Sequence, residues 1–317
     1  MKTSIASILT AGAALLVGLH PTPTRADILY VANGGNNTIE KFTSGGVGSL
    51  FAGVPFATDQ GLNGPVGLAF DSAANLYAVN NGNNTIEKFT PGGVGSLFAS
   101  SGLNNAAGLA LDSAGNLYVA NAGDSTIQKF TPGGVRSVFA SSGLNIPIGL
   151  AFDSAGNLYA ANQSNNTIEK FTPGGVGSVF ASTGLSGPSG LAFDSVGNLY
   201  VTNVTGAGWI EKFTPGGVGS LFASTASPAI GLAFDDAGSL YAAYQNANTI
   251  ERFSATGTDL GAFASSGLNA PHFIAFTDNA GTPLKLANQA PEPSACALLA
   301  LGLPALLAFR RRRNAQA

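Results

Sequence analysis

The sequence predicts an all-β fold, a six-bladed β-propeller whose blades are four-stranded antiparallel sheets. One unit recurs along the chain, with equivalent tyrosines spaced 41 residues apart at Tyr77, Tyr118, Tyr159, Tyr200 and Tyr241. Each unit holds four short apolar segments separated by turn signals, and the two chain ends carry complementary parts of one further unit. Four antiparallel strands in about 40 residues are the unit of a propeller blade.

The repeat that begins at Gly149 illustrates the four predicted strands, which we name A, B, C and D in chain order. They cover residues 149–152, 158–161, 167–171 and 178–181. Strand A leads to strand B through "DSAGN", in which Gly156 suits the left-handed residue that follows a type I turn. The second copy has Ala74 at this place, and a left-handed alanine costs about 1 kcal/mol relative to glycine.

The other two connections within a repeat are also informative. Strands B and C are joined by the polar, Asn-rich loop "NQSNN". Strands C and D are joined by "TPGG", and the order Pro173 then Gly174 predicts a type II turn. Tight reversing turns inside each unit argue against the alternative architecture, a β-solenoid, in which successive coils stack on one another.

The chain ends determine the number of blades. Residues 28–52 contain segments of types B, C and D without an A, and residues 273–276 ("FIAF") supply a final A. The chain therefore has 24 strands, enough for six blades, with the last blade closed by strands from both termini. We expect residues 273–276 to share a sheet with residues 38–42, because an open ring would leave bare sheet edges. Residues 284–288 ("LKLAN") are a spare B-like segment that could compete with residues 28–32.

Both termini carry targeting features outside the propeller, which we place at residues 27–290. Residues 1–26 have a positively charged start, an apolar stretch and a small-x-small sequence, "TRA", before Asp27. These are the parts of a signal peptide that signal peptidase removes. Residues 291–317 consist of a Pro-Glu-Pro motif, a 16-residue apolar run and an arginine cluster: Pro291, Glu292, Pro293, then 294–309, then Arg310, Arg311, Arg312 and Arg313.

This three-part tail resembles the PEP-CTERM sorting signal of Gram-negative bacteria. The apolar run is at the short limit for a transmembrane helix, and the arginines would hold its end in the cytoplasm. The resemblance implies a transient inner-membrane anchor, cutting near the motif by an exosortase, and a final location at the cell surface or outside the cell. A plain C-terminal anchor explains the apolar run and the arginines but leaves the motif unexplained.

Cysteine usage and charge exclude several classes of site and partner. The single cysteine, Cys296, lies in the tail, so the mature domain has neither a disulfide nor a thiol-based site. Residues 27–290 hold eight Lys or Arg and sixteen Asp or Glu, a net charge of −8. An acidic surface without basic clusters argues against nucleic acid and anionic lipid as partners.

The sequence of the repeat, "GLAFDSAGNLYAAN" followed by "TIEKFTPGG", resembles the NHL-repeat family of propellers. The resemblance covers almost all of residues 28–288 and implies the propeller fold. It says little about function, because such rings host hydrolases, lyases and binding scaffolds.

Several polar residues recur in every repeat, and we interpret them as mainly architectural. The aspartates after strand A suit the first position of a turn, where the carboxylate accepts backbone N–H groups; they are Asp71, Asp112, Asp153, Asp194 and Asp235. The recurring Glu-Lys pairs, such as Glu87-Lys88 and Glu169-Lys170, are predicted to be surface charges of the blades. The asparagines that end strand B suit unusual turn conformations. A ring of such amides could also bind a neutral polar ligand or a cation; the candidates are Asn80, Asn121, Asn162 and Asn203, with Asn33.

A few residues break the repeat and are therefore candidates for a specific site. They are the only tryptophan, Trp209; Tyr244, where other copies have Asn; Phe56 and Asp59 in the longest D–A connection; and His272 before the final A strand. Strand polarity places all of them toward the end of the ring that carries the B–C and D–A loops. Trp209, Tyr244 and Phe56 could there stack on sugar rings or anchor a protein partner.

Two families of ring-shaped enzymes are candidates, the first of which has a similar "GLAF…G.LYV" sequence, and both fit poorly. Calcium-dependent lactonases of the gluconolactonase type place a metal-binding Asn just before the "GLAF"-like strand. The residues in that place here offer no carboxylate cluster for a hard cation; they are Val66, Ala107, Ile148, Ser189, Ile230 and His272. Virginiamycin-lyase-like enzymes use histidine, and His272 is the only histidine of the mature domain.

The sequence therefore predicts an exported, non-catalytic binding or structural propeller, with an exopolysaccharide or a surface protein as partner. No metal site, no other cofactor and no catalytic group is expected, because one His and no mature Cys allow no Ser-His-Asp, Cys-His or multi-His arrangement. The alternative is a hydrolase or lyase that uses His272 with Asp59 or another nearby aspartate.

Overall fold

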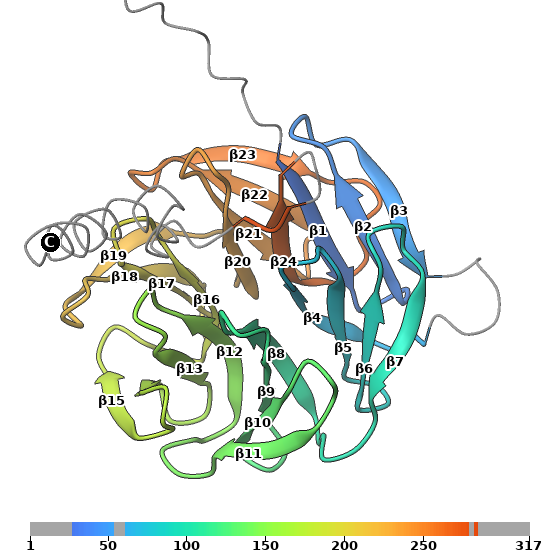
Figure 1. Ribbon diagram of the computed structural model, residues 1–317. Helices are drawn as coiled ribbons and strands as arrows, with labels where there is room; N and C mark the ends of the chain where they lie inside the picture. The colour runs from blue at the N-terminus through green and yellow to red at the C-terminus, as the bar shows by residue number, and fades with distance from the viewer. Residues whose placement is uncertain (1–26, 54–60, 279–281, 285–317) are drawn as a thin grey trace, which may run out of the picture.

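The structure is a computed structural model that describes residues 27–53, 61–278 and 282–284. Its strands form six four-stranded antiparallel sheets around a common centre (Figure 1), which confirms the predicted six-bladed propeller. Among these residues, no helix is long and apolar enough to cross a membrane. The predicted signal peptide, the Pro-Glu-Pro motif, the apolar run and the arginine cluster all lie outside the described residues.

The strands match the predicted segments A to D in every blade. The closing sheet contains β24 (Pro271–Thr277), β1 (Ile28–Asn33), β2 (Thr38–Phe42) and β3 (Gly48–Gly53). The other sheets are, in chain order, β4 (Pro65–Phe70), β5 (Leu76–Asn80), β6 (Thr85–Phe89), β7 (Gly95–Ala99); β8 (Ala106–Leu111), β9 (Leu117–Asn121), β10 (Thr126–Phe130), β11 (Arg136–Ala140); β12 (Pro147–Phe152), β13 (Leu158–Asn162), β14 (Thr167–Phe171), β15 (Gly177–Ala181); β16 (Pro188–Phe193), β17 (Leu199–Asn203), β18 (Trp209–Phe213), β19 (Gly219–Ser224); and β20 (Gly231–Phe234), β21 (Leu240–Tyr244), β22 (Thr249–Phe253), β23 (Asp259–Ala264).

The two ends of the chain close the ring as predicted. β24 pairs antiparallel with β1, so that Val31 lies opposite Ile274. Strand β1 therefore occupies the B position of this blade. Of the spare segment, Leu284 is described and donates its backbone N–H to the Phe276 carbonyl at 3.2 Å. Residues 285–288 lie outside the described residues.

Both hairpins of a blade use the same turn, which corrects the prediction for "TPGG". The A–B hairpin has Gly156 at φ 80°, the left-handed residue expected after a type I turn. In the C–D hairpin the left-handed residue is Gly175, at φ 82°, and not Gly174, where a type II turn requires it. The Gly175 N–H donates to the Thr172 carbonyl at 2.8 Å, so this connection is also a type I turn followed by a left-handed glycine.

The core lies between neighbouring blades, where strand-B tyrosines meet phenylalanines of two sheets. Tyr30 makes edge-to-face contacts with Phe51 of its own blade and Phe70 of the next, both with ring centroids 5.0 Å apart. Equivalent contacts recur around the ring, for example between Tyr159 and Phe193. Such pairs contribute about 0.5–1.5 kcal/mol beyond their burial, so the repeated tyrosine holds each blade against its neighbour.

Strand A lies at the centre of the ring, where adjacent blades meet backbone to backbone. A Cβ atom on Gly149 would overlap the carbonyl oxygen of Ser189 in the next strand A. Glycine at this position therefore allows the inner strands to approach closely. Phe273 occupies the equivalent position in β24 and breaks this pattern.

Candidate functional site

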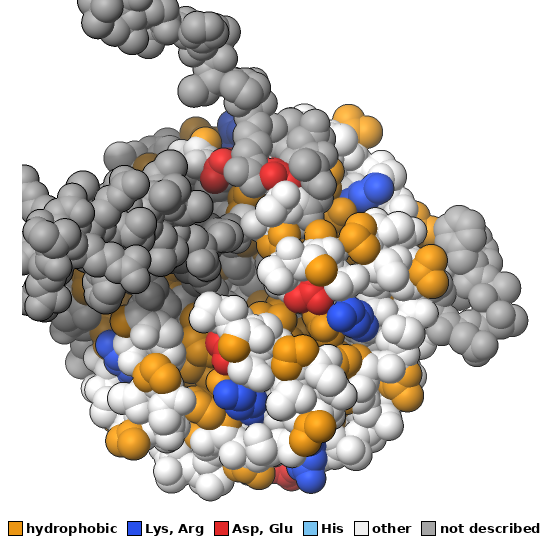
Figure 2. Space-filling model, viewed as in Figure 1, with side chains coloured by type: hydrophobic (Ala, Val, Ile, Leu, Met, Phe, Trp, Pro, Cys, Tyr) orange, Lys and Arg blue, Asp and Glu red, His pale blue; other side chains and the backbone are white. Residues whose placement is uncertain are grey.

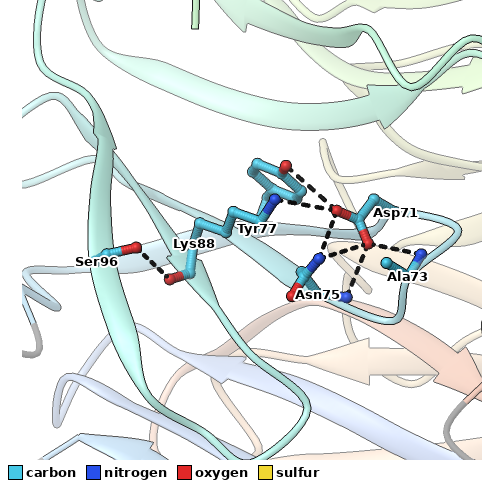
Figure 3. A network of polar contacts seen from close by, with 6 residues as sticks. All are labelled: Asp71, Ala73, Asn75, Tyr77, Lys88 and Ser96. Carbon is cyan, nitrogen blue, oxygen red and sulfur yellow. Dashed lines mark hydrogen bonds and ion pairs between the residues drawn. The ribbon is translucent and has the colours of Figure 1, made fainter. Parts of the chain in front are cut away.

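The repeated aspartates form a polar cluster inside each A–B hairpin (Figure 3). The Asp71 carboxylate accepts hydrogen bonds from the Ala73 and Asn75 backbone N–H groups at 3.0 and 2.8 Å. It also accepts a bond from the Tyr77 hydroxyl and pairs with Lys88, whose Nζ lies 3.3 Å from the carboxylate and 5.0 Å from the Tyr77 ring centroid. Equivalent Lys–Asp pairs occur in three other blades. The predicted turn role of these aspartates is confirmed.

The asparagines that end strand B are fully buried, so they do not form an exposed ring of amides. Asn80 is 0% exposed, and Asn121, Asn162 and Asn203 are buried to the same degree. The Asn80 amide donates to the Gly61 carbonyl at 2.7 Å, and its oxygen accepts the Asn63 N–H at 3.1 Å. Each amide thus fastens the D–A loop to strand B, which corrects the suggestion that this ring could face a ligand.

The Glu-Lys pairs are not pairs of surface charges, contrary to the prediction. Glu87 is 4% exposed, and Glu169 and Glu211 are buried as well. Burial raises the pKa of the Glu87 carboxyl. In the third copy the equivalent residue is Gln128, and Arg136 donates to its side-chain oxygen at 3.2 Å. In the pairs with a buried glutamate only the lysine reaches the surface, where it pairs with the aspartate of the same blade.

The aromatic residues that break the repeat have separate environments. Tyr244 is 1% exposed, packs in the core between blades and has a pKa that burial raises, so it is not available for stacking on a ligand. Asn ends strand B in the other copies and bonds the D–A loop. In this copy the larger Tyr244 side chain fills the core between the blades. Trp209 is half-buried at the start of β18, at the predicted end of the ring. Phe56 and Asp59 lie outside the described residues.

His272 lies at the mouth of the ring beside the B–C loop of the neighbouring blade. Its Nε2 atom is 2.9 Å from the Gln245 side-chain nitrogen, and burial lowers the pKa of the ring. The imidazole is therefore neutral at pH 7 and accepts a hydrogen bond from Gln245. Across the described residues, no three His, Cys, Asp or Glu side chains are close enough together to hold a metal ion.

A cavity opens at the opposite end of the ring, where the A–B and C–D turns are. The cavity has a volume of about 570 Å³ and lies between the C-terminal ends of the inner strands. Its walls are mainly apolar, and include Leu111, Phe152, Phe193, Phe234, Phe276 and Leu284. Figure 2 shows one face of the ring, on which hydrophobic side chains gather toward the middle with acidic and basic side chains beside one another around them.

Charged groups at the rim of this cavity are mostly acidic. Asp194, Asp235 and Asp236 line it together with Lys212, which pairs with Asp194 at 3.8 Å. A volume of this size and an apolar wall with a few polar groups are typical of small-ligand sites. This cavity was not predicted from the sequence. The signal that could have indicated it is the aromatic residue that ends strand A in most copies.

Comparisons with known proteins agree with the fold. Residues 103–130 match the family model for the NHL repeat, so the predicted resemblance is confirmed over that segment. No curated protein is significantly similar to the chain. The structure resembles that in "Crystal structure of Nidogen/Laminin Complex" with a TM-score of 0.69 and 21% identity, covering 79% of this chain and 98% of that chain.

Two enzyme structures are also similar. A streptogramin B lyase has a TM-score of 0.61 and 18% identity, covering 81% of this chain and 93% of that chain. A gluconolactonase from Xanthomonas campestris has a TM-score of 0.60 and 18% identity, covering 68% of this chain and 82% of that chain. At these identities the likeness establishes a shared propeller fold, and fold alone does not determine function.

Proposed function

We propose that this chain is an exported, non-catalytic binding or structural module of the cell surface or extracellular matrix. The observation that carries the proposal is the use of the repeated polar residues. The aspartates, lysines and asparagines of the blades bond to their own turns and loops, and are not gathered around a reactive centre. The repeats thus build a rigid ring, and recognition is left to the two ends of that ring.

The central cavity is the site that we favour for a partner. Its apolar wall would accept an aliphatic or aromatic group projecting from a protein or from a substituted glycan. The acidic rim would favour a neutral or cationic ligand over an anionic one. Trp209, half-buried at the opposite end, is the second candidate contact, because an indole ring stacks well on a sugar.

The proposal that the protein is exported depends on the sequences of its two termini. The apolar start and the Pro-Glu-Pro tail support processing by signal peptidase and an exosortase, with transient anchoring in the inner membrane of a Gram-negative bacterium. The net charge of −8 over residues 27–290 supports a partner other than nucleic acid.

A hydrolase or lyase is the second candidate function, and one observation favours it. His272 lies half-buried at the mouth of the ring, and burial lowers its pKa, which favours the unprotonated imidazole that a general base requires. Its described hydrogen-bond partner is Gln245, an amide that cannot stabilise a protonated ring as a carboxylate would. We therefore rank this candidate below the binding module.

Binding and turnover assays separate the two candidates. We expect the purified protein to bind on a glycan array or to a candidate surface protein, and to lose at least tenfold in affinity, about 1.4 kcal/mol, when Ala151→Phe fills the cavity. Ala73→Phe, on the same face but outside the cavity, is the matched control. If binding is lost with Trp209→Ala and kept with Ala151→Phe, the binding site lies at the B–C end of the ring. Turnover of a lactone or ester that disappears in His272→Ala would overturn the binding proposal.

A further inference from the structure

The outer rim of the ring exposes aliphatic side chains in a regular pattern. Ten of the twelve large hydrophobic side chains that are exposed in the described part lie on the outermost strands or on the turns that lead into them. We call this set the outer-strand row; it comprises Val47, Val94, Leu97, Val135, Val138, Val176, Val179, Val218, Leu221 and Leu260. Leu97 and Leu221 are 59% and 61% exposed. The pattern recurs at equivalent positions of successive blades, so it belongs to the repeat.

The backbone of each outermost strand is paired on one side only. β7 is the last strand of its sheet and is hydrogen-bonded only to β6, and the same holds for the last strand of every other blade. Each such edge presents a row of N–H and C=O groups that another strand can pair with. The edge is short, because the register between β6 and β7 shifts after Leu97, and this bulge limits the flat stretch to residues 95–97.

Charges that would protect these edges are scarce. Natural proteins block exposed edges with charged residues, above all lysine, or with proline. Four of the outermost strands, β3, β7, β15 and β19, carry neither. β11 carries Arg136 and β23 carries Asp259. Two uncharged copies of such a strand can approach each other even though the propeller as a whole has a net charge of −8 over residues 27–290.

We propose that the outermost strands are self-association surfaces, and that their partner is the outermost strand of a second copy of this chain. Two equivalent strands can pair antiparallel about a twofold axis, so the surface is complementary to itself. The strip is narrow, which suits another strand better than the broad face of an unrelated globular protein. Leu97 and its equivalents would then pack against their counterparts across the new pair.

The arrangement of these surfaces makes the assembly open-ended. Outermost strands lie all around the rim of the ring (Figure 1), so a pair formed at one blade leaves the others free for further copies. Each contact is weak on its own, because the flat edge is short. Several contacts per molecule increase the overall strength of the assembly by raising the effective concentration of the remaining edges. Such a chain would form arrays whose extent depends on its concentration.

Sedimentation of the full chain tests this proposal. One variant carries Leu50→Lys, Leu97→Lys, Val179→Lys and Leu221→Lys, one on each of the four outermost strands that carry neither a charge nor a proline. The control carries Ser72→Lys, Ser113→Lys, Ser154→Lys and Val196→Lys at exposed positions of the A–B hairpins. Both sets add the same positive charge to an acidic propeller, so both lower the general repulsion equally. All proteins are kept in the same mild detergent, so any association of the unchanged C-terminal tail is common to them.

We expect the average mass of the parent and the control to rise with concentration, whereas the outer-strand variant stays monomeric with an unchanged melting temperature. If the lysine variant fails to fold, the same four positions changed to serine should still reduce the average mass at least twofold at the highest concentration. A parent that remains monomeric, a control that also dissociates or an outer-strand variant that still assembles would overturn the proposal. So would a monomeric parent that binds glycans or lipid vesicles through these side chains.

Discussion

At the scale of single residues, the repeated polar side chains act as short-range connectors. Asn80 joins strand B to the D–A loop, and Asp71 joins a hairpin to a lysine and a tyrosine of the same blade. A buried polar group costs about 1–3 kcal/mol when it loses its partner. These residues are therefore needed for the stability of the blades that contain them, whether or not a ligand binds.

Ala74 provides a direct test of the turn geometry. It has φ 62°, in the left-handed region that the other A–B hairpins reserve for glycine. We expect Ala74→Gly to stabilise the fold by about 0.5–1 kcal/mol, because glycine adopts this conformation without a Cβ clash. The reverse change, Gly156→Ala, should destabilise it by a similar amount. Urea unfolding of both variants measures the effect, and an Ala74→Gly variant less stable than the parent would contradict it.

Buried glutamates predict a dependence of stability on pH. Burial raises the pKa of Glu87 in the folded state, so the folded protein binds this proton more tightly than the unfolded chain does. The resulting stabilisation is complete below the unfolded pKa of about 4.3 and is lost as the pH rises through the folded value. We expect Glu87→Gln, which copies the natural Gln128, to raise the melting temperature at pH 7 and to have little effect at low pH.

Glu40→Gln is the control for this measurement. Glu40 occupies the equivalent position in β2 but is only half-buried, and burial raises its pKa as well. We therefore expect Glu40→Gln to raise the melting temperature at pH 7 by less than Glu87→Gln does. Equal melting temperatures for parent and Glu87→Gln from pH 4 to pH 7 would show that the carboxylate is well compensated inside the protein.

At the scale of elements, the closing blade is the critical assembly. β24 comes from the C-terminal side of the propeller and β1 from the N-terminal side, and each covers an edge that the other would otherwise expose. The side chains of this pair belong to the core between the first and last blades, where Val31 and Ile274 are buried. Closure therefore joins the two ends through both backbone pairing and burial.

Truncation tests this closure. A chain that ends at Ala270 lacks β24 and should lose cooperative unfolding, because the removed pairing and core exceed the total stability of about 5–15 kcal/mol that is typical of a domain. A chain that ends at Ala290 keeps β24, drops only the tail and should unfold like the parent. Circular dichroism during heating distinguishes them, and equal melting curves for both truncations would contradict the role of β24.

At the scale of the whole molecule, the ring separates three kinds of surface. The B–C end carries Trp209 and His272, the A–B end carries the apolar cavity, and the rim carries the outer-strand row. A rigid ring can therefore hold a partner at one end and contact copies of itself at the rim. This division fits the proposal of a matrix component that both binds a partner and associates with copies of itself.

Processing is the prediction that belongs to the complete chain. We expect the protein recovered outside the cell to begin near Asp27 and to end near Pro291, because both flanks have the composition of targeting segments. Intact-mass measurement of the exported protein checks both ends at once. A mass that still includes Cys296 and the arginine cluster would contradict removal of the tail.

The sequence by itself determined the number of blades, the strand order and the closure of the ring. These features depend on local chemistry: the turn residues of each hairpin, the short apolar segments between the turns and the permuted ends at residues 28–52 and 273–276. The left-handed place of Gly156 was predictable for the same reason, although the "TPGG" turn was assigned to the wrong type.

Only the tertiary structure decided which of the repeated residues are buried. Glu87 was predicted to be a surface charge and Tyr244 to be a contact for a ligand, yet both are enclosed by neighbouring segments. The cavity likewise appears only when inner strands of several blades are placed around one centre. The repeat specifies the structure inside a blade, whereas burial depends on which surfaces the next blade covers, and that packing is set by contacts between residues far apart in the chain.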